Sequence, residues 1–79
     1  MMKLTINRRE NGRGFNTFFT HRSMKYYADL IFVPYCGSEC MIFKVKRSGE
    51  IDWSGVYCKR HIPITEEQLI SCIEDFLNE

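Results

Sequence analysis

Three cysteines and one histidine have the residue types and the spacing of a metal site. They are Cys36, Cys40, Cys58 and His61. The first two form a C-x3-C pair and the last two a C-x2-H pair, and thiolate and imidazole groups are common ligands of tetrahedral zinc. The Cys-Pro-x-Cys-Gly knuckle of many such sites is missing. The sequence leaves two alternatives: a zinc ion held by these four residues, or no cofactor and reduced cysteines that serve as small apolar residues.

The strands around these residues decide whether the thiols can meet. Segments 30–35 and 51–57 are rich in β-branched and aromatic residues, and segment 40–46 alternates in polarity. The connection 36–40 is short, contains a glycine and suits an antiparallel hairpin. The sequence therefore predicts three strands, with a hairpin turn at 36–40.

The expected register pairs residues across both turns of this region. The first turn sets Val33 opposite Phe43. In the second hairpin Ile51 lies opposite Val45, and that register brings Trp53 opposite Phe43. Because strand side chains alternate between faces, the bulky residues gather on one side. The residues expected to face the core are Met41, Phe43, Trp53 and Tyr57. The same parity places Cys36, Cys40 and Cys58 together on the other face.

The N-terminal part of the chain predicts a further hairpin. Segment 2–7 alternates cleanly, and segment 15–21 is rich in aromatic residues and threonine. Between them, residues 11–12 are Asn-Gly, which tolerates the positive φ angles of a type I′ turn. Pairing about that turn sets Leu4 opposite Phe19. The following segment, 23–28, is interpreted as a connection that runs into the strand at 30–35.

The C-terminal segment predicts an amphipathic helix over 65–77. Thr65 and Gln68 form a capping box. In this motif the Thr65 side chain accepts from the backbone N–H of Gln68, and the Gln68 side chain reaches back to the backbone N–H of Thr65. The apolar residues of the segment fall within one arc at 100° per residue. Cys72 belongs to this arc, so we expect it to be buried and away from the other three thiols.

These elements predict an α+β fold in a single domain, residues 1–79. The expected architecture is an antiparallel sheet of four or five strands, made of two hairpins plus a strand, with one C-terminal amphipathic helix packed on one face. A chain this short obtains only about 3–5 kcal/mol from its core, so a metal, a partner or oligomerisation can supply part of its stability.

Charge is distributed unevenly along a chain of net charge +1. Residues 1–63 contain all eleven Lys and Arg against five acids, whereas residues 64–79 contain five acids and no base. Basic residues near aromatic ones can grip a nucleic-acid backbone and stack bases, or bind a protein partner. The residues predicted for this role are Arg8, Arg9, Arg13, Arg22 and Lys25. Acids near a helix C-terminus oppose the helix dipole, and a partner with a basic surface would explain their placement. The residues of this acidic partner-binding face are Glu74, Asp75 and Glu79.

The sequence does not predict an enzyme. It has no Walker A loop and no G-x-G-x-x-G motif. Cys58 and His61 are the one nearby pair of nucleophile and base, without a family signature around them, so no catalytic residue is predicted. The longest apolar run, 30–33, is far shorter than the ~20 residues of a membrane helix, and the N-terminus lacks the apolar region of a signal peptide. We therefore expect a cytoplasmic protein with no membrane partner.

No residue pattern in the chain identifies a family. Short chains without enzyme motifs are common among phage and mobile-element proteins that block host machinery, anti-CRISPR proteins among them. From size and the lack of motifs we expect a small non-enzymatic binding protein that inhibits a host protein by occluding its surface. The alternative is a zinc-stabilised nucleic-acid-binding module. A protein partner, a nucleic acid and self-association are the partners considered.

Overall fold

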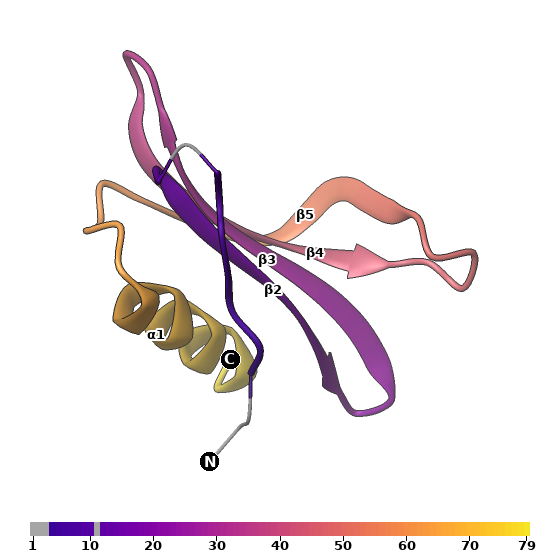
Figure 1. Ribbon diagram of the computed structural model, residues 1–79. Coiled ribbons are helices and arrows are strands. Elements are labelled where there is room, and N and C mark those ends of the chain that lie inside the picture. The colour runs from indigo at the N-terminus through magenta and orange to yellow at the C-terminus, as the bar shows by residue number, and fades with distance from the viewer. Residues whose placement is uncertain (1–3, 11) are drawn as a thin grey trace.

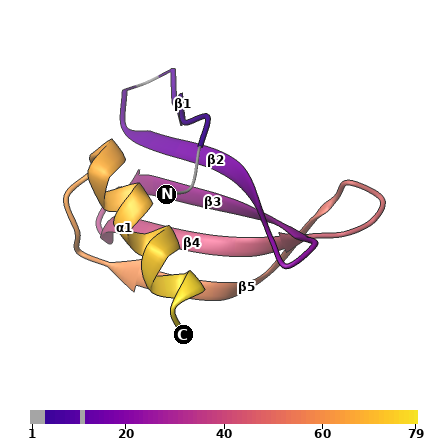
Figure 2. The ribbon, with the colours of Figure 1, turned by 90° about the horizontal axis from the view of Figure 1, so that it is seen from below.

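An antiparallel sheet with one helix packed against it makes up the computed structural model, which describes residues 4–10 and 12–79. The elements are β1 (Asn7–Arg8), β2 (Gly14–His21), β3 (Met24–Val33), β4 (Gly37–Val45), β5 (Ile51–Arg60) and α1 (Glu66–Leu77). The five strands lie side by side in the order of the chain, as Figure 2 shows. The predicted α+β class and architecture are therefore confirmed.

The register of the first hairpin is confirmed where the structure describes it. Asn7 pairs with Asn16, in the same register as the expected pairing of Leu4 with Phe19. The strand is shorter than predicted, because β1 spans two residues. The start of the predicted strand at residues 2–3 and the first residue of the predicted turn, Asn11, lie outside the described residues.

The interpretation of residues 23–28 as a connection is wrong. β2 and β3 form a tight hairpin in which His21 pairs with Met24 across a two-residue turn. Both turn residues, Arg22 and Ser23, have positive φ angles of 51° and 65°. The primed turns that match strand twist need such angles and usually take glycine or asparagine. The usual turn signal is missing from this sequence, which is why the hairpin was not predicted.

The turn between β3 and β4 lies earlier than predicted. The chain reverses at residues 34–36, where the N–H of Cys36 donates to the carbonyl of Val33 at 3.0 Å. Val33 then pairs with Gly37, and Tyr27, not Val33, pairs with Phe43. The expected pairing of Val33 with Phe43 is therefore wrong.

The expected orientation of β4 is wrong as well. Ile42 and Cys40 are fully buried on the side that α1 covers, and Met41 and Phe43 point to the other side. Both sides of this strand are apolar, so its sequence does not determine which one the helix covers. The helix covers the side of Leu30, which pairs with Cys40.

A bulge in β5 explains why only part of the predicted pairing in the last hairpin is observed. The pairing of Val45 with Ile51 is as predicted, but Ile42 pairs with Tyr57, so residues 53–56 all lie opposite the single residue Phe43. We call residues 53–56 the arch. It includes Gly55, whose φ of +77° favours glycine. The arch leaves Trp53 beside Phe43 as expected and moves Tyr57 to the opposite face.

The helix begins as the capping box predicts. Thr65 is the N-cap, and its hydroxyl accepts the N–H of Gln68 at 3.1 Å. α1 packs on one face of the sheet against β2, β3 and β4 (Figure 1). The core between them comprises Phe15, Phe19, Tyr26, Ala28, Leu30, Cys40, Ile42, Leu69, Cys72 and Ile73. In the described part of the chain, no helix is long and apolar enough to cross a membrane.

Candidate binding surface

The structure does not bring the four predicted zinc ligands together. Cys40 is fully buried between the sheet and α1, whereas Cys58 pairs with Met41 and shares its exposed, opposite face. Cys36 lies in the turn at residues 34–36, and His61 lies beside Gly37. Among residues 4–10 and 12–79, no three His, Cys, Asp or Glu side chains are grouped so that they could hold a metal. The prediction that Cys36, Cys40 and Cys58 share one face is wrong because the turn and β4 differ from the expected register.

Cys40 has a buried thiol as its neighbour. Cys72 is buried as predicted, but its side chain lies next to Cys40, which contradicts the expectation that it lies away from the other thiols. Burial and the neighbouring Cys72 raise the pKa of the Cys40 thiol well above its usual value. This thiol therefore stays protonated at neutral pH and acts as a small apolar core residue.

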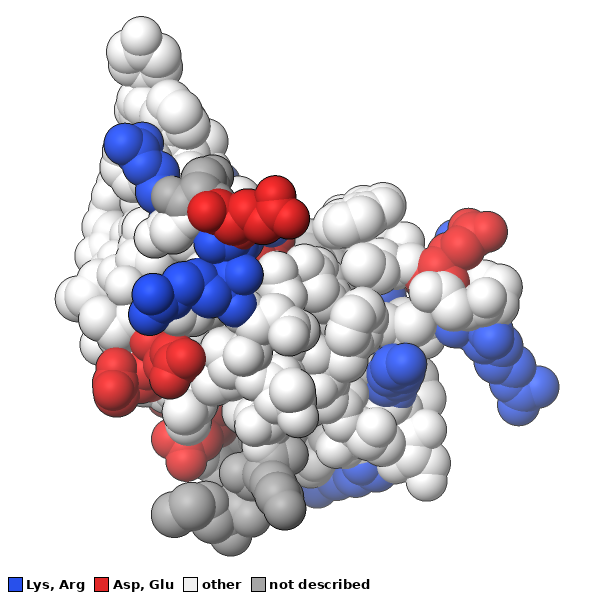
Figure 3. Space-filling view, viewed as in Figure 1, with Lys and Arg blue, Asp and Glu red and all other residues white. Residues whose placement is uncertain are grey.

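The five residues of the predicted basic site do not form one patch. Arg8, Arg9 and Arg13 flank the start of β2, and Arg22 and Lys25 follow its end. Eight strand residues separate the two groups, about 25 Å at ~3.3 Å per residue. On the side of the molecule seen in Figure 3, Lys and Arg are likewise interleaved with Asp and Glu.

Individual members of that basic set already contact the rest of the protein. Arg9 forms a salt bridge with Asp29 of β3. The Arg8 guanidinium lies 5.5 Å from the centroid of Phe15, and that of Arg13 lies 5.4 Å from the centroid of Phe32. A continuous basic surface is therefore not assembled from these residues.

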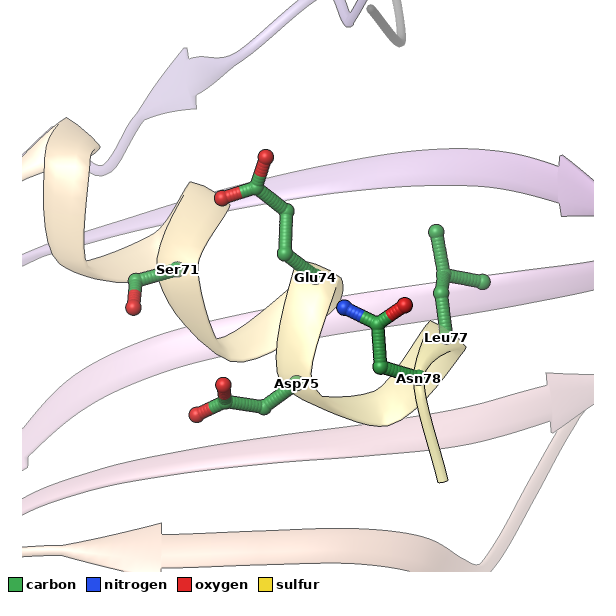
Figure 4. A pocket seen from close by; sticks show the side chains of 5 residues that line it. All are labelled: Ser71, Glu74, Asp75, Leu77 and Asn78. Carbon is green, nitrogen blue, oxygen red and sulfur yellow. The ribbon is translucent and has the colours of Figure 1, made fainter.

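The predicted acidic face lies at the end of α1. Glu74, Asp75 and Glu79 are all exposed. Figure 4 shows Glu74 and Asp75 extending in different directions from the C-terminal half of the helix. Asp75 makes a salt bridge of 3.7 Å with the exposed Lys59 of β5, a kind of contact that contributes little stability. These acids remain accessible without forming a shaped site.

The sheet face away from α1 carries the most distinctive surface. We call it the open face, because in the described residues no helix packs on it (Figure 1). Four aromatic side chains cross it, one from each of β2 to β5, and we call them the aromatic row. They are Phe18, Tyr27, Phe43 and Trp53. Neighbouring ring centroids are 4.9, 6.4 and 5.0 Å apart, so the rings form a continuous band.

Strand pairing places these rings. Phe18 pairs with Tyr27, and Tyr27 pairs with Phe43, so the three rings stand in line across the strands. The arch then puts Trp53 edge-on to Phe43 at an interplanar angle of 69°. The two ends of the row are accessible: Phe18 is 48% exposed and Trp53 is 67% exposed. The open face therefore presents large apolar side chains at the two ends of the row, whereas Phe43 is buried with 7% of its surface exposed.

Two ion pairs lie on the open face beside the aromatic row. Arg9 pairs with Asp29, and the Nε of Arg60 lies 3.0 Å from Oε2 of Glu39. Lys25 extends over Phe18, with its Nζ 5.0 Å from the ring centroid. The charges on this face are thus mostly matched within the protein.

The Arg9–Asp29 pair is incompletely satisfied on both sides. Burial raises the pKa of Asp29 above the ordinary value, although the hydrogen bond and the charge of Arg9 act in the opposite direction. The Oδ1 of Asp29 and the Nε of Arg9 are both buried and have no hydrogen-bond partner among the described residues. Desolvation outweighs the arginine at this position.

A hollow of about 220 Å³ lies next to the exposed end of the aromatic row. Its walls combine apolar and acidic side chains from β3, β4 and the arch. They are Asp29, Ile31, Glu39, Met41, Phe43 and Trp53. Gly55 approaches Met41 closely, since a Cβ at this position would lie 3.1 Å from the Met41 methyl carbon. The arch therefore forms one side of the hollow.

Sequence reasoning missed the open face as a site. Phe43 and Trp53 were expected on the face under the helix, and Tyr27 lay in a segment interpreted as a connection. Phe43 is indeed buried, but on the face away from α1. The signal that could have found this site is the occurrence of two aromatic residues in succession, as in Phe18-Phe19 and Tyr26-Tyr27. One ring of each pair must face away from a single helix.

Scans of protein-family models, of curated proteins and of solved structures find no match to this chain. Function is therefore inferred from the geometry of the open face and from the charges around it.

Proposed function

We propose that this protein is a small non-enzymatic binding protein that docks on a partner protein through the open face and occludes the surface it covers. The observation that carries the proposal is the aromatic row, which is exposed at both ends. Exposed apolar patches rimmed by polar groups are typical of protein interaction sites, and tryptophan and tyrosine are enriched among residues that dominate binding energy.

The charges of the open face favour a protein over a nucleic acid. Asp29 and Glu39 lie within this face, and their carboxylates repel phosphate groups. The arginines beside them, Arg9 and Arg60, are engaged with those carboxylates. An apolar centre with matched charges around it resembles the anatomy of protein interfaces.

A second candidate, nucleic-acid binding, has one observation in its favour. Another hollow lies at the end of the sheet where the turns after β2 and β4 meet. Its charged lining residues are one acid, Asp52, and four bases, Lys25, Lys44, Lys46 and Arg47. Lys25 links this basic end to Phe18 of the aromatic row. Basic residues next to exposed rings are the combination that binds single strands. The four predicted zinc ligands do not support this candidate, because Cys40 and Cys58 face opposite sides of the sheet.

An inhibitor from a phage or a mobile element is the biological role that we propose for this binding. The basis is the exposed aromatic row together with the lack of enzyme motifs in the sequence. A 79-residue domain can inhibit a larger protein by covering a functional surface, without chemistry of its own.

Affinity capture with matched variants tests the proposal. The tagged protein is incubated with lysate of its native host, with and without nuclease, and compared with Trp53→Ala, Phe18→Ala and the control Tyr35→Ala. Tyr35 is fully exposed in the β3–β4 turn, away from the open face. We expect the two open-face variants to lose a nuclease-resistant protein by about tenfold or more, and the control to retain it.

Two outcomes would overturn this assignment. Equal capture by all three variants would show that the open face is not the binding surface. Capture of nucleic acid that weakens steeply with salt, with no protein retained after nuclease treatment, would instead support the second candidate.

A further inference from the structure

We propose that the hollow beside Trp53 receives a positively charged side chain, an arginine or a lysine, from the partner protein. This inference rests on the proposed function and specifies what the open face recognises. The hollow is lined by two aromatic rings and two carboxylates, Phe43 and Trp53 with Asp29 and Glu39.

The aromatic walls suit a cation. Trp53 stands edge-on to Phe43, with the ring centroids 5.0 Å apart, and is largely exposed. A cation near the face of an indole ring is attracted by its quadrupole, and tryptophan gives the strongest effect of this kind. The hollow, at about 220 Å³, is several times the ~30 Å³ that one water occupies in the liquid. It therefore has room for a guanidinium or an ammonium group.

The two carboxylates favour a positively charged group in the hollow. Glu39 accepts a hydrogen bond from Arg60, whose side chain is 65% exposed and can therefore shift toward solvent. Asp29 has a buried oxygen without a partner among the described residues. Arg9 offsets only part of the cost of burying this carboxylate. A further positive charge would stabilise both carboxylates, whereas an anion would be repelled.

The position of the hollow fits a contact made within a larger interface. It lies at one end of the aromatic row, so a partner that covers the row also brings its own side chains over the hollow. Apolar contact along the row would exclude water from the charged contact and strengthen it.

Trp53 provides a direct reporter, because it is the one tryptophan in the chain. We would titrate the protein with Nα-acetyl-arginine amide and with Nα-acetyl-citrulline amide, a neutral compound of nearly the same shape, and follow Trp53 fluorescence. Nα-acetyl-lysine amide serves as the second cation. We expect the arginine compound to bind about tenfold more tightly than citrulline, because charge-assisted hydrogen bonds are stronger than neutral ones.

Glu39→Gln and Glu50→Gln form the matched pair of variants. Glu39 lines the hollow, whereas Glu50 lies exposed in the turn before β5. Glu39→Gln should weaken arginine binding severalfold, and Glu50→Gln should leave it unchanged. Thermal unfolding of both variants establishes that each is folded.

Equal affinity for arginine and citrulline, or no fluorescence change with arginine or lysine up to the solubility limit, would overturn the cation site. Either result would leave the proposed function intact if capture of the partner still depends on Trp53 and Phe18. Loss of that dependence would overturn the proposed function itself, so the two failures are distinguishable.

Discussion

The two faces of the sheet are built from the same kind of aromatic pair and differ in what covers them. On the covered face Phe19 stacks on Tyr26 with centroids 5.3 Å apart, and on the open face Phe18 contacts Tyr27 at 4.9 Å. Phe19 and Tyr26 are 5% and 8% exposed because Phe76 of α1 packs against both, whereas Phe18 is 48% exposed. One helix thus divides equivalent residues into a core and a candidate interface.

The largest effect on stability is expected for a change on the face of the sheet that α1 covers. Ile42 is fully buried against α1, and Ile42→Ala should lower the free energy of unfolding by about 2–5 kcal/mol through lost burial and a residual cavity. Urea or guanidinium denaturation measures this change. A loss below about 1 kcal/mol would show that the helix packs less closely on this face than the structure indicates.

A smaller loss of stability is expected for a change at Gly14, where the Arg9 side chain crosses onto the open face. A Cβ on Gly14 would lie 2.5 Å from the carbonyl oxygen of Leu30 and 2.9 Å from the Arg9 side chain. Gly14→Ala should therefore destabilise the protein by about 1–3 kcal/mol, the usual cost of overpacking. Gly49→Ala is unsuitable as a control because of its positive φ, and Ser48→Ala in the same exposed turn serves instead. Equal stability of the Gly14 and Ser48 variants would contradict the close approach.

The pH dependence of stability tests the environment of Asp29. Because burial raises its pKa in the folded state, the ionised carboxyl is disfavoured there relative to the unfolded chain. Its contribution to stability is fully present below the ordinary pKa of 3.8 and is lost as pH rises through the higher folded value. Asp29→Asn should remove this decline from the curve of unfolding free energy against pH. An unchanged curve would show that Asp29 is well solvated or fully compensated.

The smallest effect on stability is expected at the exposed end of the aromatic row. Phe18→Ala removes a half-exposed ring and its contact with Tyr27, so we expect a loss of about 1 kcal/mol or less. The same variant should strongly reduce partner capture, which separates a binding role from a structural one. A loss comparable to that of Ile42→Ala would mean that the ring belongs to the core.

Much of the fold could be predicted because local signals agreed with it. The Thr65 cap, the pairing of Val45 with Ile51 and the register of the first hairpin all follow from short-range patterns. The turn at Arg22 and Ser23 could not be predicted, because neither residue is one that normally adopts a positive φ.

The candidate site depended on a choice that the sequence leaves open. β4 is apolar on both sides, so either Cys40 and Ile42 or Met41 and Phe43 could have faced the helix. The choice is made by long-range packing of α1, and it decided both that the predicted zinc ligands separate and that Phe43 joins the aromatic row. The arch at Gly55 then changed the parity of β5, which alternation alone cannot reveal.

The chain contains its own probe for the central claim that the open face binds the partner. Cys58 and Cys36 are both exposed, but Cys58 lies on the open face, where it pairs with Met41, and Cys36 lies in the β3–β4 turn. The decisive measurement is the rate of iodoacetamide labelling of each thiol, by mass spectrometry, in the free protein and in its complex with the captured partner. The proposal predicts that the complex protects Cys58 and leaves Cys36 labelled at its free rate. Unchanged labelling of Cys58 in the complex, or protection of Cys36 alone, would contradict it.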